Sequence, residues 1–191
     1  MLILNSIRSA FVHIPKTGGT SVATAIKQCS SDHWFYDENS GVHASIQFMH
    51  GQDLGRFIDN YIVQVRNPYD RFISAYYHQL PDQQYTIDEM LNFLDNNLTF
   101  PDTKLLTPQH QYIKINSDYI KRYSKEYTVS IFRTEDGDIW KYLRSLGYPV
   151  FERHERKSDK LFITVNDLTN KQREIIYNYY KKDFGKFGYD E

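Results

Sequence analysis

The hydrophobic residues of the chain gather in three short runs, and stretches with helical spacing of their apolar positions follow them. Residues 10–14, 61–65 and 129–132 are rich in β-branched and aromatic side chains, which predicts three strands. The predicted helices cover residues 22–28, 71–80, 87–94, 139–146 and 171–184. Strands that alternate with helices favour parallel pairing. The pattern therefore predicts an α/β fold in three layers, with a central, mostly parallel sheet flanked by helices.

The length and composition are those of one globular domain. The 191 residues are 40% hydrophobic and 25% charged, with no internal repeat, low-complexity tract or flexible linker. We therefore predict a single domain over residues 1–191. The 23 basic and 24 acidic side chains give a net charge of −1. That balance disfavours a protein that binds nucleic acid nonspecifically, because such proteins are clearly basic.

The chain has one cysteine and no long apolar segment. Cys29 alone cannot form a disulfide within the chain or a cysteine-based zinc site, and a single thiol is typical of a reducing compartment. The apolar run at the start of the chain is too short for a membrane span or a secretory signal. These features predict a cytoplasmic protein without a membrane span.

A segment suited to binding an anion follows the first predicted strand. Its members are Lys16, Thr17, Gly18, Gly19, Thr20 and Ser21. Adjacent glycines let the backbone approach a ligand closely, and the helix predicted to follow presents free N–H groups and a partial positive charge. The lysine adds a full charge and the three hydroxyl residues add donors. The combination predicts a site for a phosphate-like group, whereas two glycines alone would fit an ordinary strand-to-helix turn.

The arrangement differs from the P-loop of ATPases and GTPases. In that loop a lysine follows the glycines, and a serine or threonine that holds magnesium comes next. Here Lys16 precedes Gly18 and Gly19, and no Gly-Lys-Ser or Gly-Lys-Thr occurs in the chain. The sequence therefore argues against a magnesium-dependent NTPase and predicts no metal site.

A second anion-binding motif follows the second predicted strand. Arg66 comes directly after residues 61–65, at the sheet edge where ligands of α/β folds bind. Ser74 follows about two helical turns later. An arginine fork and a serine hydroxyl can together hold a second phosphate group. Arg71 could do the same or pair with an acidic residue, and a surface salt bridge is the alternative role for Arg66.

Two segments, FVHIPKTGGTSV at residues 11–22 and VRNPYDRFISAYYH at residues 65–78, together resemble sulfotransferases that use 3′-phosphoadenosine 5′-phosphosulfate (PAPS). The similarity is greatest to the carbohydrate branch with the heparan and chondroitin enzymes, especially its short bacterial members. Later landmarks of that family are matched less specifically by PQHQYI at 108–113, SIFRTED at 130–136 and YKKDFGKFGY at 180–189.

The resemblance implies a P-loop-like fold and a reaction that moves the sulfuryl group of PAPS to an acceptor hydroxyl. It implies that residues 16–21 surround the 5′-phosphosulfate, and that Arg66 and Ser74 bind the 3′-phosphate. Lys16 would stabilise the charge that grows on the leaving phosphate during in-line displacement. A late basic loop often helps to hold the nucleotide in this family, which makes Arg156 and Lys157 further candidates. No metal is implied.

A histidine is the natural general base near neutral pH. The resemblance places the base between the two anion motifs, where the chain has His43 and His50. His43 is followed by a small residue and matches best, His50 is the backup, and the carboxylate of Asp53 stays open. We interpret His13, which lies in the first predicted strand, as structural.

Two other functions stay open. A P-loop kinase of another type would use ATP and need magnesium, whereas an inactive nucleotide-binding protein on the same fold would bind the donor and leave acceptors unmodified. The intact set of Lys16, Arg66 and Ser74 argues against the inactive protein. The acceptor that the resemblance implies is a hydroxyl group of a glycan or another small molecule.

Overall fold

The computed structural model describes residues 1–31, 33–35, 43–79, 85–115, 117–152 and 163–190. The chain forms two compact units, each built from two separate segments. The first unit combines Met1–Val65 with Gln111–Glu155, and the second combines Arg66–His110 with Arg156–Glu191. The single domain over residues 1–191 that the sequence predicts stays a prediction.

The first unit is built around a five-stranded mixed sheet. Its strands are β1 (Leu2–Leu4), β2 (Ser9–Val12), β3 (His33–Phe35), β4 (Asn60–Val65) and β5 (Thr128–Arg133). The order across the sheet is β3-β1-β2-β4-β5. β2, β4 and β5 run parallel, whereas β1 pairs antiparallel with both β2 and β3. The carboxyl ends of the three parallel strands therefore lie at the same edge of the sheet.

The parallel part of the sheet agrees with the sequence prediction, and the antiparallel edge is new. The three predicted strands correspond to β2, β4 and β5, with ends that differ by one or two residues. The two additional strands, β1 and β3, have only three residues each. A run of three residues is too short to show the alternation that marks a strand, so local sequence does not reveal it.

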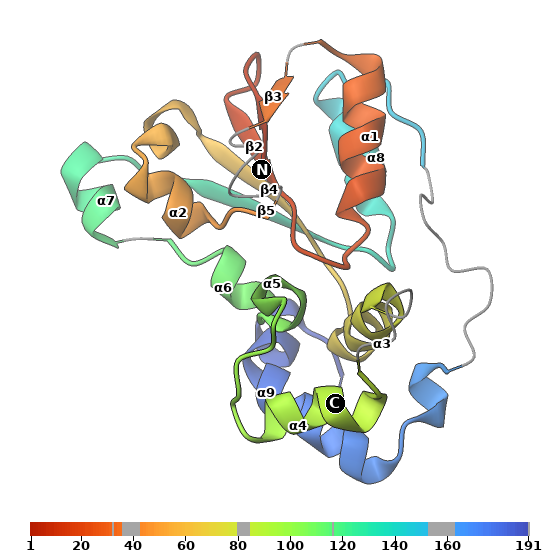
Figure 1. Cartoon of the computed structure of the whole chain (residues 1–191). Coiled ribbons are helices and arrows are strands. Elements are labelled where there is room, and N and C mark those ends of the chain that lie inside the picture. Colours follow the sequence, from red (N-terminus) through yellow and green to blue (C-terminus); the bar gives the residue numbers. More distant parts are fainter. Residues whose placement is uncertain (32, 36–42, 80–84, 116, 153–162, 191) are drawn as a thin grey trace. The chain divides into compact units, whose positions relative to one another are not determined.

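Helices cover both faces of this sheet (Figure 1). On one side lie α1 (Gly19–Cys29) and α8 (Asp138–Ser145), and on the other lie α2 (Ile46–Gly51), the 3-10 helix η1 (Leu54–Phe57) and α7 (Ser117–Tyr123). Phe11 and Ile62 of the sheet pack against Ile26 of α1 and Leu143 of α8, and all four side chains are fully buried. This layering agrees with the predicted α/β class.

The second unit is helical. Its helices are α3 (Pro68–Gln79), α4 (Ile87–Asp95), α5 (Thr103–Leu106), the 3-10 helix η3 (Val165–Asp167) and α9 (Asn170–Phe187), and α6 (Gln109–Tyr112) begins in it. Phe72, Leu91, Ile176 and Phe184 lie in its buried core. The sequence predicted α3, α4 and α9 with small errors at the ends. α3 begins at Pro68 because proline fits the first turn of a helix, where its missing N–H is no loss.

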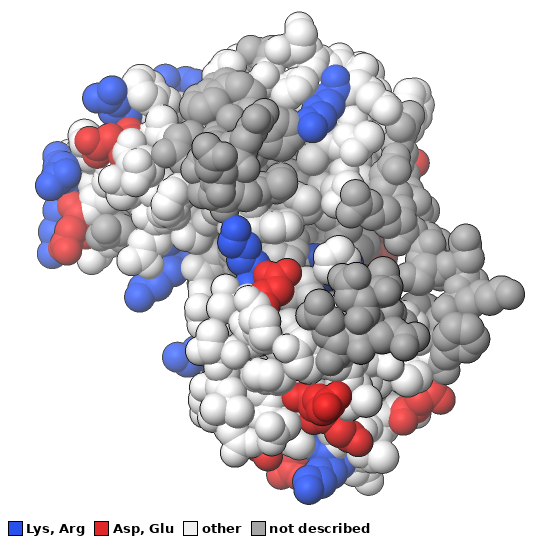
Figure 2. Space-filling model, in the orientation of Figure 1, with Lys and Arg blue, Asp and Glu red and all other residues white. Residues whose placement is uncertain are grey.

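The surface of the described residues carries mixed charge. On the face in Figure 2, acidic and basic side chains lie interspersed, and the described part of that face shows no broad area of a single sign. Among the described helices, none has the length and apolar character needed to cross a membrane.

Candidate active site

The loop between β2 and α1 turns tightly because two of its residues adopt left-handed backbone conformations. Lys16 has φ 67° and Gly18 has φ 77°. Glycine takes this conformation freely, whereas for lysine it is uncommon and has to be held by the surrounding structure. The hydroxyl of Thr17, a fully buried residue, donates to the carbonyl oxygen of Ile14 at 3.0 Å. This hydroxyl, which the sequence analysis counted among the donors for a ligand, therefore serves the loop itself.

The amino end of α1 keeps the character of an anion site. The helix begins at Gly19, three residues earlier than the sequence predicted, with Gly18 as the residue before it. No side chain caps this end, and the first turn holds no acidic residue. Thr20 and Ser21 lie inside the first turn. An uncapped helix start offers backbone N–H groups and the positive end of the helix dipole to an anion.

Gly19 and the ring of His13 are in close contact. A β-carbon added to Gly19 would lie 2.1 Å from Cδ2 of His13, a separation that real side chains do not reach. His13 is buried directly after β2, and its ring also lies 4.5 Å from the ring of His43, centre to centre. The structure thus agrees with a structural role for His13, which supports both the loop glycine and the second histidine.

His43 is attached to the chain just before the predicted anion loop, residues 16–21. Its Nδ1 lies 2.7 Å from the carbonyl oxygen of His13. A carbonyl oxygen only accepts hydrogen bonds, so Nδ1 must carry the proton. In the neutral ring, the lone pair that can take up a proton is therefore on Nε2. The side chain is half-buried, and the contact brings the predicted base and the predicted phosphosulfate loop together in one unit.

His50 lies in a different environment. It is 2% exposed, its Nε2 lies 3.2 Å from the hydroxyl of Tyr61, and its ring stacks on Tyr119 with 4.2 Å between centres. Burial lowers its pKa from 6.5 to about 4. The His50 ring therefore stays neutral near pH 7. It lies in an aromatic cluster on the sheet face opposite α1, where it contributes to packing. These contacts favour His43 over the backup base.

The carboxylate of Asp53, the third candidate base, also has a partner. Its Oδ1 accepts a hydrogen bond from the hydroxyl of Tyr123 at 2.6 Å. Asp53 itself is exposed and has a left-handed backbone with φ 56°. It connects the end of α2 to α7, which is a structural use of the carboxylate.

Thr134, which directly follows β5, ties the anion loop to the sheet. Its Oγ1 lies 2.8 Å from the carbonyl oxygen of Thr17 and 2.9 Å from that of Val65, so the hydroxyl hydrogen is shared between them. Its backbone N–H donates to the same Val65 oxygen at 2.8 Å. In the sequence, residues 130–136 stand out only by their weak similarity to the family. Thr134 reaches Val65 because β5 pairs with β4, and this pairing is a feature of the tertiary structure.

Arg66, in the second unit, is held by its backbone. The buried side chain of Gln109 accepts a hydrogen bond from the Arg66 N–H at 2.9 Å and donates one to the Arg66 carbonyl oxygen at 2.8 Å. The guanidinium group is half-exposed and forms no ion pair with any described residue. The alternative role of a surface salt bridge is therefore not seen in the described part of the chain.

Asp183 of α9 completes the support for Arg66. Its fully buried carboxylate accepts hydrogen bonds from the backbone N–H of Gln109 at 2.7 Å and of His110 at 2.9 Å, and it lies 2.7 Å from Nδ1 of His110. Asp183 thus supports Arg66 through Gln109. The two residues belong to segments 180–189 and 108–113, which resemble the family only weakly. Sequence reasoning missed this role, because the contact joins residues 74 positions apart.

The two other polar residues of the second motif differ in exposure. Ser74 lies on α3 and is half-buried. Arg71 is 1% exposed, and its Nη2 donates to the carbonyl oxygen of Leu105 at 3.1 Å. Arg71 therefore stabilises the interior of the second unit and is not available as the alternative phosphate ligand that the sequence suggested.

Two predicted site residues, Arg156 and Lys157, lie outside the described residues. Among the residues that are described, no group of three or more His, Cys, Asp or Glu side chains is placed to hold a metal ion.

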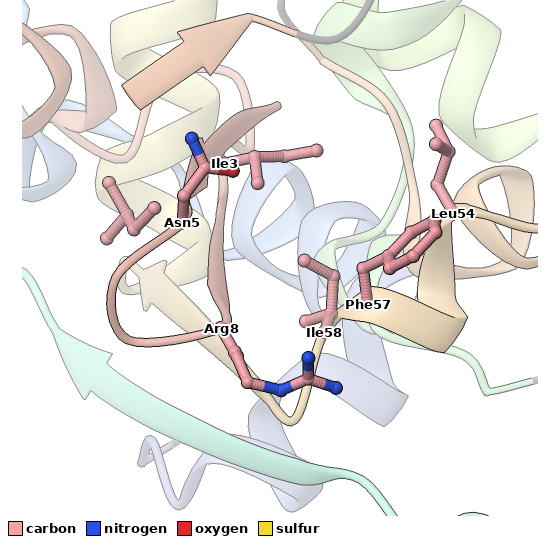
Figure 3. A pocket seen from close by; sticks show the side chains of 7 residues that line it. Ile3, Asn5, Arg8, Leu54, Phe57 and Ile58 are labelled. Atoms are coloured by element: carbon pink, nitrogen blue, oxygen red, sulfur yellow. The ribbon is translucent and has the colours of Figure 1, made fainter. Parts of the chain in front are cut away.

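A separate hollow of about 220 Å³ lies at the other end of β2 (Figure 3). Ile3, Leu54, Phe57 and Ile58 form its mostly apolar lining, and Arg8 stands at its edge. Arg8 precedes β2, whereas the anion loop follows it, so this hollow is not part of the anion site.

Comparison with known proteins bears on these sites. A family model described as "Sulfotransferase family" matches residues 5–102, just over half of the 191 residues. The chain belongs to the sulfotransferase family. No significant match was found among curated proteins or among solved structures.

The matched part of this sulfotransferase contains the anion loop, His43, Arg66 and Ser74. Three positioning residues, Gln109, Thr134 and Asp183, lie beyond the matched residues. The family match therefore covers the predicted ligand contacts other than Arg156 and Lys157, and the structure adds residues that hold the loop and Arg66 in place.

Gly19→Ala should disturb the anion loop of the sulfotransferase, because the new methyl group cannot coexist with the His13 ring. We expect the free energy of unfolding to fall by about 1–3 kcal/mol. Urea denaturation followed by tryptophan fluorescence measures it. Gly51→Ala is the matched control, since nothing lies within 4 Å of the added atom, and it should be as stable as the wild type. Equal losses in both variants would contradict the contact.

The buried His50 should make the protein less stable in acid. Its pKa is about 4 in the folded state, against 6.5 unperturbed, so the unfolded chain binds more protons between these values. The stabilisation is complete above pH 6.5 and falls, by up to about 3 kcal/mol, as the pH drops towards 4. Chemical denaturation across this range should show a shallower fall in His50→Gln. The same change at exposed His78 should retain the wild-type slope, and identical slopes in all three proteins would refute the assignment.

Asp183→Asn should weaken the second unit without changing its shape. The amide can accept only one of the two backbone hydrogen bonds and turns an N–H group towards the other donor. We expect a loss of about 3 kcal/mol in the free energy of unfolding. Asp190→Asn, at an exposed position nearby in the sequence, is the control and should change little. Equal stability of the two variants in urea denaturation would show that the buried network is not needed.

Proposed function

We propose that this sulfotransferase moves the sulfuryl group of PAPS to a hydroxyl group, most simply on a carbohydrate. The observation that carries the proposal is the 2.7 Å hydrogen bond from His43 Nδ1 to the backbone of His13, which joins a base of defined tautomer to an uncapped anion loop. We also propose that the protein acts in the cytoplasm and that the reaction needs no metal ion.

The donor would be bound through its two anionic ends. Residues 16–21 would surround the 5′-phosphosulfate, while Arg66 and Ser74 would bind the 3′-phosphate. Two observations support this assignment: the guanidinium of Arg66 forms no ion pair with a described residue, and its backbone is held by Gln109. An arginine fork with free donors suits a phosphate. Arg156 and Lys157 stay candidates for a further contact with the nucleotide.

The proposed reaction is a direct displacement. The acceptor oxygen forms a bond to sulfur as the bond from sulfur to the bridging phosphate oxygen breaks, and the proton of the acceptor hydroxyl passes to Nε2 of His43. The products are a sulfate ester, 3′-phosphoadenosine 5′-phosphate (PAP) and the proton. Lys16 and the amino end of α1 stabilise the negative charge that grows on the leaving phosphate.

The hydrogen bond to His13 gives His43 two properties of a general base. It orients the ring, and it leaves the accepting lone pair on Nε2 in the neutral form. A base that is aligned in advance loses little entropy when the acceptor binds. These properties favour His43 as the base in place of His50, which is fully enclosed.

Titration calorimetry with PAP in the absence of magnesium tests the donor site. The wild type should bind PAP at least tenfold more tightly than 5′-AMP, because the second phosphate adds a charge-assisted contact. Arg66→Ala should remove that advantage, while Lys182→Ala, which also removes one positive charge from the second unit, should keep it. Binding of ATP with magnesium in preference to PAP would overturn the proposal.

Transfer of labelled sulfate from PAPS to a panel of glycans tests the base. His43→Gln should lower kcat by about 10²–10⁴-fold and leave PAP affinity within about twofold, because a general base acts on the reaction step. His78→Gln serves as the control at an exposed histidine and should retain full activity. Unchanged kcat in His43→Gln would exclude the proposed role.

A further inference from the structure

A buried carboxamide lies directly beneath the anion loop. Gln64, the penultimate residue of β4, is only 4% exposed. A β-carbon placed on Gly18 would lie 3.8 Å from its Nε2 and 4.0 Å from its Oε1. Gly18 has no side chain and is itself exposed, so no side chain at position 18 covers the amide. In the sequence, Gln64 is one polar residue within an apolar strand, a pattern that does not mark a ligand-binding residue.

The buried amide of Gln64 has unused hydrogen-bonding capacity. Its Oε1 is buried and has no hydrogen-bond partner among the described residues. Buried polar atoms without partners are rare in folded proteins, because water can no longer satisfy them. A carboxamide can also turn over, so either its oxygen or its NH₂ group can face the loop.

A second polar side chain below the loop, that of Thr134, already has hydrogen-bond partners. The methyl group of Thr134 lies 3.7 Å from the same Gly18 position, and its hydroxyl is shared between the carbonyl oxygens of Thr17 and Val65. Of these two side chains, Gln64 is therefore the one with hydrogen-bonding capacity left for a ligand. Its location at the carboxyl end of a parallel strand, beside an uncapped helix start, favours an anion as that ligand.

We propose that the carboxamide of Gln64 is a ligand-binding group of the anion loop, whose NH₂ group donates to an oxygen of the 5′-phosphate or phosphosulfate. The inference rests on the proposed function, in which the loop holds that end of the donor. A neutral donor beneath the loop complements the charge of Lys16 and adds direction, since an amide N–H points at one oxygen.

Gln64→Met tests the proposal, because methionine has a similar length and no hydrogen-bond donor. The wild type and the variant are titrated with PAP, with adenosine 3′-phosphate and with inorganic pyrophosphate. We expect about a tenfold or greater loss of affinity for PAP and pyrophosphate, and none for adenosine 3′-phosphate, which lacks the 5′ group. The melting temperature of the ligand-free protein should stay the same or rise, since an unpaired polar atom has been removed.

Two further variants separate ligand binding from packing. Ile62→Val lies on the same face of β4, two residues earlier, and should lower the melting temperature without changing the affinity for PAP. Gln64→Glu keeps the size of the side chain but places a carboxylate, which cannot donate in its charged form, under the loop. It should lose more affinity for PAP than Gln64→Met does.

The outcomes distinguish this inference from the proposed function. Equal affinity of wild type and Gln64→Met for PAP overturns the role of Gln64 and leaves the proposed function standing. If the wild type binds pyrophosphate but not PAP, the proposed donor is wrong, and the pyrophosphate affinities alone decide the role of Gln64. A wild type that binds neither anion refutes both. Failure of both Gln64 variants to fold would show that the amide serves the fold, which also refutes the role.

Discussion

The close packing of the His13 ring against Gly19 is the constraint on which the candidate active site depends. Because residue 19 is a glycine without a β-carbon, the chain can pass from β2 into α1 directly over the imidazole. A β-carbon at this position would have no room. The same histidine offers its backbone oxygen to His43 and its ring to the His43 ring. Loop, helix start and candidate base are thus positioned by one buried residue, and each of these contacts lies within the first unit.

The second unit holds the backbone of Arg66 by a different set of contacts. A buried carboxylate, Asp183, orients the start of α6, and the side chain of Gln109 then binds both backbone polar groups of Arg66. The chain thereby satisfies the backbone just after β4, while the guanidinium group forms no ion pair with a described residue. Because the backbone of Arg66 is already ordered, binding a phosphate would cost only the ordering of its side chain.

Each unit has groups with unused hydrogen-bonding or charge capacity at or next to a predicted ligand contact. The amino end of α1 has no side-chain cap, Arg66 forms no ion pair among the described residues, and the Gln64 oxygen has no hydrogen bond there. By contrast, Arg71, His50 and Asp53 have partners inside their own units. This division separates groups that stabilise the fold from groups with capacity left for a ligand.

Local sequence determined the parallel strands, most long helices, the loop between β2 and α1 and the family, because each depends on residues that are near in sequence. The spacing of apolar positions predicted β2, β4 and β5, and the glycines beside Lys16 marked the loop. Only the tertiary structure added the antiparallel strands β1 and β3, which are too short to carry a pattern. It also decided which histidine contacts the loop, placed Arg71 in the interior, and joined Asp183 to Gln109 and Thr134 to Thr17. These outcomes depend on hydrogen bonds and packing between segments 30 to 117 residues apart, and local sequence patterns do not record such contacts.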